Sequence, residues 1–120
     1  MAYAVIQNIP NGQIIKVTIA NGQTESDEFP TGGMVVWQVM LPAAGWTTAD
    51  LKFKHGYATG QLSTITDGVT DGSDYTVQAE GGKWSPVDPA KGVGCLGFAS
   101  IVAAASQSGG DDLYVALKFI

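Results

Sequence analysis

The sequence predicts an all-β fold, a single-domain antiparallel β-sandwich of jelly-roll-like type. Turn dipeptides that contain glycine recur at short intervals, and the segments between them are short and rich in β-branched and aromatic residues. Many short strands separated by such turns are typical of a sandwich or barrel. A chain of 120 residues has room for one core, so we expect residues 1–120 to form one domain.

The turn dipeptides mark where the chain reverses. Several are Asn-Gly or Asp-Gly, which favour type I′ hairpin turns because both central residues need a positive φ. In chain order the dipeptides are Asn11-Gly12, Asn21-Gly22, Gly32-Gly33, Ala44-Gly45, Asp67-Gly68, Asp71-Gly72, Gly81-Gly82 and Gly109-Gly110.

The predicted strands lie between these turns. Four segments place apolar side chains at alternate positions, which is typical of a strand with one buried face. They are 13–19, 51–57, 74–80 and 113–120. Segment 34–41 is apolar on both faces, as a central strand of a sandwich is, and we expect its Trp37 to lie in the core.

Segment 94–106 is rich in alanine but is still predicted to be extended. Gly94 and Gly97 disfavour a helix, whereas Ile101 and Val102 favour a strand. We expect this strand to end near residue 102. A turn rich in Ser, Gly and Asp would then pair it with the last strand as a terminal hairpin.

The charge balance argues against two classes of partner. Eleven acidic residues face six basic ones, giving a net charge of −5, and all six basic residues are lysines. Arginine is the usual bidentate donor to phosphate and guanine, and a negative chain is repelled by a polyanion, so we expect no nucleic-acid partner. The apolar runs are shorter than the ~20 residues of a membrane helix, so we expect no membrane partner either.

Residues that could support catalysis are few, and we expect no enzyme and no cofactor. Cys95 and His55 are the only residues of their kinds, which is too few for a closed zinc site. A Cys95–His55 dyad would need a feature that lowers the thiol pKa, and the apolar surroundings of Cys95 offer none. His55 continues the apolar row of segment 51–57 and is interpreted as a partly buried structural residue.

The acidic loop 67–74 raises the question of a calcium site. Asp67, Asp71 and Asp74 are clustered, but their spacing lacks the alternate oxygens and terminal Glu of an EF-hand loop. Two successive Asp-Gly turns that close a hairpin explain the segment better. We therefore predict no metal site.

Two tryptophans follow glycines at predicted strand boundaries. Trp46 and Trp84 could stack on sugar rings if they are exposed, as aromatic residues of carbohydrate-binding sandwiches do. Alternatively, each covers one end of the sandwich core. We expect the second arrangement for both tryptophans, and at Trp46 we expect Pro42 and Gly45 to turn the chain so that the indole closes the core edge.

Five sequence elements, taken in order, resemble small structural proteins of tailed-phage and prophage virions. They are TIANGQTESDEF (18–29), LPAAGWTTADLKFKHG (41–56), the Tyr75-Thr76-Val77 strand, the Asp88-Pro89-Ala90 turn and the closing β-strand. The resemblance extends over nearly the whole chain, and it rests on the ordered set rather than on any single motif.

The resemblance implies a non-enzymatic β-sandwich that decorates the outer capsid as a cement protein. Its partners would be the major capsid protein and neighbouring copies of itself, with a homotrimer around a capsid symmetry axis as one arrangement. The protein would be made in the bacterial host cytoplasm and reside on the virion exterior. Contacts to the capsid or to neighbouring copies are expected in the acidic loops and in the N-terminal residues 1–12, at Tyr3, Val5, Ile6, Ile9 and Pro10. The alternative is a lectin-like module of a tail or fibre that binds through Trp46 and Trp84.

Overall fold

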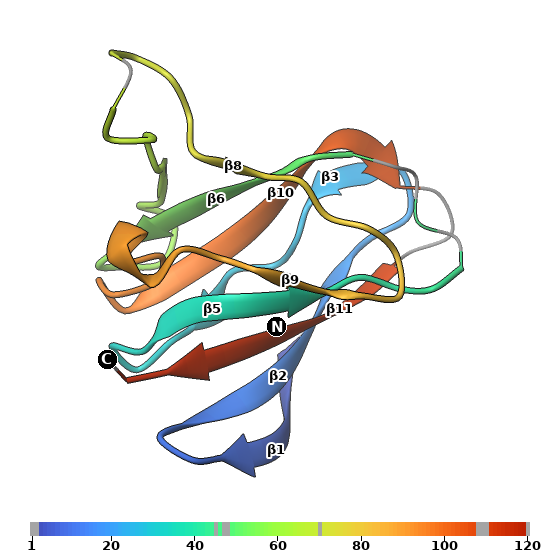
Figure 1. The fold of residues 1–120 in the computed structure, drawn as a ribbon, viewed down its shortest axis with the longest axis horizontal. Helices are drawn as coiled ribbons and strands as arrows, with labels where there is room; N and C mark the ends of the chain where they lie inside the picture. The colour runs from blue at the N-terminus through green and yellow to red at the C-terminus, as the bar shows by residue number, and fades with distance from the viewer. Residues whose placement is uncertain (1–2, 45, 47–48, 70, 108–110, 120) are drawn as a thin grey trace.

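The computed structural model describes residues 3–44, 46, 49–69, 71–107 and 111–119. Two antiparallel β-sheets lie face to face, one above the other in Figure 1, with the hydrophobic core between them. The predicted all-β sandwich is therefore confirmed.

Sheet A is the lower sheet in Figure 1 and contains five strands. In spatial order they are β1 (Tyr3–Ile9), β2 (Gly12–Ile19), β11 (Asp111–Lys118), β5 (Val35–Met40) and β9 (Trp84–Pro86). The predicted alternation of β2 is confirmed: Ile15, Val17 and Ile19 are buried and point into the core.

Sheet B lies above it and is built around β10 and β6. Its strands are β3 (Gln23–Glu25), β10 (Phe98–Gln107), β6 (Leu51–Gly56) and β7 (Ser63–Thr64), with β4 (Phe29–Pro30) also paired to β10 and β8 (Thr76–Val77) to β6. A short 3₁₀ helix, η1 (Pro89–Lys91), follows β9.

The predicted alternation in sheet B holds better than the predicted strand lengths. Leu51 and Phe53 of β6 are buried, but the row ends there, because Tyr57 lies beyond the strand and is 77% exposed. In segment 74–80, Val77 and Ala79 are buried while only two residues form a strand. Side-chain burial, not ladder pairing, produces the alternation in that segment.

The predicted terminal hairpin is wrong. β10 continues to Gln107, and β10 and β11 then belong to different sheets. β10 pairs with β6 from Phe98 to Ala103, whereas β11 pairs with β2 along its whole length. Each strand gains more by lying in the middle of its own sheet, where one face is buried, than it would by pairing with its sequence neighbour.

The predicted core position of Trp37 is also wrong. Ala116 of β11 lies opposite Gln38, and the next residue, Leu117, lies opposite Val36. Trp37 is therefore the extra residue of a β-bulge. It is half-buried, lies outside the core cluster and is displaced to the outer face of sheet A, while Val36 and Val39 stay in the core.

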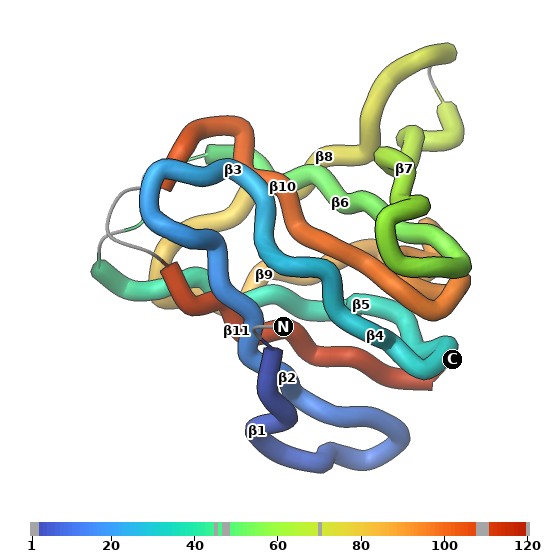
Figure 2. The backbone as a smooth tube through the Cα atoms, turned by 180° about the vertical axis from the view of Figure 1, so that it is seen from behind, coloured from blue at the N-terminus to red at the C-terminus, as the bar shows by residue number. Residues whose placement is uncertain are grey.

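A second bulge changes the facing of β1. Val5 pairs with the inward-facing Ile15, but the register shifts before Gln7, which pairs with Ile14 on the opposite face. Gln7 and, two positions later, Ile9 therefore point outward. The β1–β2 hairpin projects beyond the two sheets, as Figures 1 and 2 both show.

The turn of this hairpin consists of Pro10 and Asn11, not of the predicted Asn11-Gly12 pair. Ile9 pairs with Gly12, and Asn11 has a φ of 63°. Gly12 is required for a different reason: a Cβ atom there would lie 1.9 Å from the carbonyl oxygen of Leu117. The glycine allows β2 to lie close to β11.

Candidate functional site

The outer face of sheet A is unusually apolar for a surface that no element of the described structure covers. Strand register places on it Ile14 of β2, Ala116 of β11 and Trp84 of β9. Trp37 joins them because of its bulge, and Ile9 because of the bulge in β1. The two irregularities thus gather apolar side chains that regular strands would have directed elsewhere.

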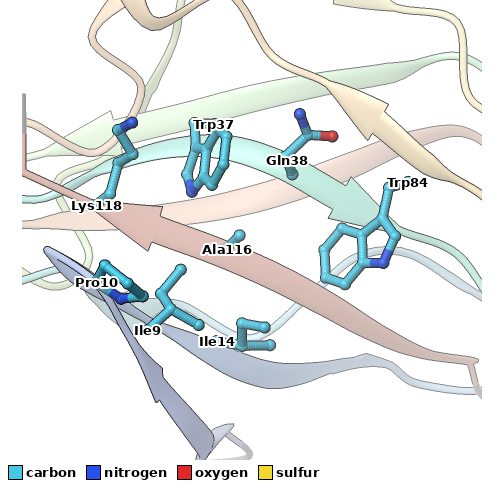
Figure 3. A pocket seen from close by; sticks show the side chains of 8 residues that line it. All are labelled: Ile9, Pro10, Ile14, Trp37, Gln38, Trp84, Ala116 and Lys118. Carbon is cyan, nitrogen blue, oxygen red and sulfur yellow. The ribbon is translucent and has the colours of Figure 1, made fainter.

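These side chains line a groove of about 500 Å³ between the N-terminal hairpin and β9. Figure 3 shows the lining residues projecting from the sheet on both sides of β11. They are Ile9, Pro10, Ile14, Trp37, Gln38, Trp84, Ala116 and Lys118. The groove offers two indoles, two isoleucines and one proline, with a single amide and a single ammonium group as its polar side chains.

Trp37 and Lys118 form one end of the groove. The Lys118 ammonium lies 4.5 Å from the centroid of the Trp37 ring, within the range of a cation–π interaction. The Nε1 atom of Trp37 is buried and has no hydrogen-bond partner. A buried N–H donor without an acceptor is costly, so this indole position lowers the stability of the folded state.

The outer face of sheet A carries charges of both signs: Lys16 and Lys118, and Asp112, which accepts a hydrogen bond from Thr18 at 2.8 Å. Lys52, Lys54 and Lys83 each form an ion pair, at 2.8, 2.9 and 3.0 Å. Lys91 donates to the carbonyl oxygen of Asp67. Lys118, like Lys16 on the same face, forms no ion pair within the described part of the chain.

The predicted contact residues separate into three groups. Ile9 and Pro10 line the groove. Val5 and Ile6 are about half exposed on the free edge of the hairpin, outside the groove. Tyr3 packs partly against the core.

The two tryptophans proposed as a sugar platform have different surroundings. Trp46 is half-buried and packs against the core, as the end-plug interpretation predicted. The predicted position of Trp84 over an end of the core is wrong: its register in β9 places it on the outer face of sheet A, where it is 43% exposed and lines the groove. The second indole at the groove is Trp37, which sequence reasoning had assigned to the core, and Ile14, Ala116 and Lys118 were also missed.

His55 is half-buried and hydrogen-bonded to the backbone. Its Nδ1 accepts a hydrogen bond from the backbone N–H of Gly94 at 3.2 Å, which requires the neutral ring. Burial lowers the pKa of His55, partly offset by a backbone hydrogen bond to Gly92. Cys95 is exposed, and no hydrogen bond joins it to His55 where the chain is described.

Two other kinds of site, a metal site and a membrane-spanning helix, are not found among the described residues. Within the described ranges, no three His, Cys, Asp or Glu side chains gather closely enough to hold a metal ion. In the same ranges no helix has the length and apolar character needed to cross a membrane.

The comparisons with known proteins return nothing: no family model, no curated protein and no solved structure matches the chain. Function must therefore be argued from the groove and its surroundings.

Proposed function

We propose that the protein is a non-enzymatic structural protein of a tailed-phage virion, a decoration protein that binds and stabilises the outer capsid. The resemblance of the five ordered sequence elements suggests this class. The observation that supports it is the apolar groove on the outer face of sheet A, because an uncovered apolar patch of this kind is typical of a surface that binds another protein.

Two further features fit such a role. The N-terminal hairpin borders the groove and exposes Val5 and Ile6, so it extends the apolar surface beyond the sheet. Sheet edges elsewhere in the described structure are strands of two or three residues, too short to invite uncontrolled edge pairing.

The test is binding of the purified protein to expanded capsids that lack it. We expect cosedimentation with the capsids and a higher capsid melting temperature. Trp84→Ala, which removes an indole from the groove, should weaken binding at least tenfold. Tyr57→Ala truncates an exposed aromatic residue outside the groove and should bind like the unaltered protein. Absence of any binding would reject the proposal, and equal loss in both variants would reject the groove as the binding surface.

A lectin-like tail or fibre module is the second candidate, and Trp84 is the observation that favours it. An exposed indole beside Trp37 could stack on a sugar ring. Sugar recognition also needs several polar groups, and the groove side chains supply only Gln38 and Lys118. A glycan array decides between the two: a hit that Trp84→Ala abolishes would favour the lectin.

A further inference from the structure

β1 has a free outer edge that is seven residues long. It lies at the end of sheet A, and among the described strands it pairs only with β2. The other edge strands, β9 in sheet A and β3 and β7 in sheet B, have two or three residues. Alternate residues of an antiparallel strand direct their N–H and C=O groups away from the partner strand. The outer edge of β1 therefore presents backbone groups to which another strand can hydrogen-bond.

β1 carries few of the features that keep natural edge strands from pairing with other chains. Those features are charged side chains, a proline within the strand, a covering element and a bulge. No charged side chain occurs before Lys16, and Pro10 lies beyond the strand. A bulge is present, but Ile6 is the only residue of β1 without a partner in β2, and residues 3–5 and 7–9 are paired. The outer edge is therefore open to pairing on both sides of the bulge.

The side chains of β1 are also incompletely covered. Val5 has the same facing as its ladder partner Ile15, yet Val5 is about half exposed whereas Ile15 is buried. The difference arises because the hairpin projects beyond the two sheets, as Figures 1 and 2 show. Ile6 is exposed to a similar degree. A strand added at the edge would cover part of both side chains and remove apolar surface from water.

A second copy of β1 fits this edge in both geometry and charge. Two identical antiparallel strands related by a two-fold axis complement each other, so that no second surface is required. Two copies of a chain with net charge −5 repel each other in most orientations. At this edge they meet through strands without charged side chains, and the nearest charge in β2 is Lys16, opposite Ala4. The projection of the hairpin also keeps the two sandwiches apart.

We propose that β1 pairs antiparallel with β1 of a second copy, so that the A sheets of a two-fold dimer join into one continuous sheet. The axis of such a pair is perpendicular to the sheet, and the outer faces of both copies lie on the same side. The contact uses the edge of β1 and leaves both grooves open on that side. The inference goes beyond the proposed function, because the dimer forms whether or not a capsid is bound. Two grooves on one side would also give a bivalent contact with any surface that they bind.

The pairing is expected to be weak in free solution. A contact through one strand is smaller than the roughly 800 Å² per partner of a standard interface, so we expect a dissociation constant of tens to hundreds of micromolar. Hydrogen exchange tests this without any variant. Amides of residues 3–9 should exchange more slowly at about 1 mM than at about 10 μM, whereas those of the edge strand β7 should not change. Exchange in β1 that is independent of concentration overturns the inference.

Charge substitutions at the middle of β1 test which strand occupies the edge. Ile6 is the central residue of the strand, so centred antiparallel pairing brings the two Ile6 side chains together. Ile6→Lys and Ile6→Glu, each alone, should weaken dimerisation at least tenfold in sedimentation velocity, because like charges then meet. An equimolar mixture of the two variants should dimerise again. Reducing buffer is needed, since the exposed Cys95 would otherwise link copies through a disulfide.

Matched controls carry changes outside the edge. Leu96→Lys and Leu96→Glu alter another exposed apolar side chain and should dimerise like the unaltered protein. Trp84→Ala should also dimerise normally, so that loss of the dimer and loss of groove binding are separate results. Circular dichroism checks that every variant is folded.

Four sedimentation results would overturn the inference. They are an unaltered protein that stays monomeric at about 1 mM, association that survives both Ile6 substitutions, a mixture of the two variants that stays monomeric, and a trimer or larger species in place of the dimer. The second result would assign self-association to another surface, and the third would leave the edge of β1 to a strand of a different protein.

Discussion

The same substitution at two tryptophans should separate a core plug from a surface residue. Trp46→Ala removes an indole that packs against the core, whereas Trp84→Ala removes one that is 43% exposed over the groove. Both changes delete the same atoms, so any difference in the free energy of unfolding reflects the two environments.

The expected magnitudes follow from burial. A fully buried indole removes about 150–250 Å² from water, worth about 4–6 kcal/mol at 25 cal/mol per Å². Trp46 is more than half buried, which corresponds to about 4 kcal/mol, and its Nε1 is buried without an acceptor, which subtracts about 1 kcal/mol. Trp84 is 43% exposed, so its buried part corresponds to about 2 kcal/mol. We therefore expect a loss of about 3 kcal/mol for Trp46→Ala and of about 2 kcal/mol for Trp84→Ala.

Urea denaturation followed by circular dichroism measures both losses. With a slope of about 2 kcal/mol per molar urea, the two midpoints should differ by about 0.5 M. Equal midpoints would contradict the end-plug interpretation of Trp46. A larger loss at Trp84 would mean that the groove face is part of the core and not a binding surface.

Three further predictions concern His55, Asp111 and Gly12. Burial lowers the pKa of His55 below its usual 6.5, so the unfolded state takes up the proton more readily than the folded state. The free energy of unfolding should therefore fall as the pH drops below about 6.5. His55→Asn keeps an acceptor for the Gly94 N–H and should flatten this part of the pH–stability curve. Burial, with repulsion from the Asp112 carboxylate, raises the pKa of Asp111, so the charged form of Asp111 is unfavourable at neutral pH. Asp111→Asn should therefore raise the melting temperature at pH 7. This gain should vanish as the pH falls toward 3.8. Gly12→Ala should cost about 3 kcal/mol in urea denaturation, because its Cβ would collide with the Leu117 carbonyl; an unchanged midpoint would show that the strands separate freely.

Strands with one buried face were the most predictable part of the fold. The rows Ile15–Val17–Ile19 and Leu51–Phe53 follow directly from alternation, since burial of one face fixes the periodicity. Strand partners were not predictable in the same way. The Gly109-Gly110 signal indicated a hairpin, yet the strands on its two sides pair with distant segments, because pairing depends on which faces can be covered.

The groove could be predicted only in part. Ile9 and Pro10 were expected contacts, but the facing of Trp37 and of Ile9 depends on two bulges that leave no clear mark in the sequence. A regular strand would have buried Trp37, as its apolar neighbours suggested. The groove also joins side chains from five strands, so it exists only once the order of sheet A is known.

The position of β11 has a consequence for when the domain can fold during synthesis. β11 lies between β2 and β5, so residues 111–118 join the N-terminal hairpin to the rest of sheet A. Until the ribosome has released these residues, β2 lacks its principal neighbour and the inner face of sheet B is only partly covered. The nascent chain must therefore wait with its apolar strands exposed, and one late segment then closes both the sheet and the core.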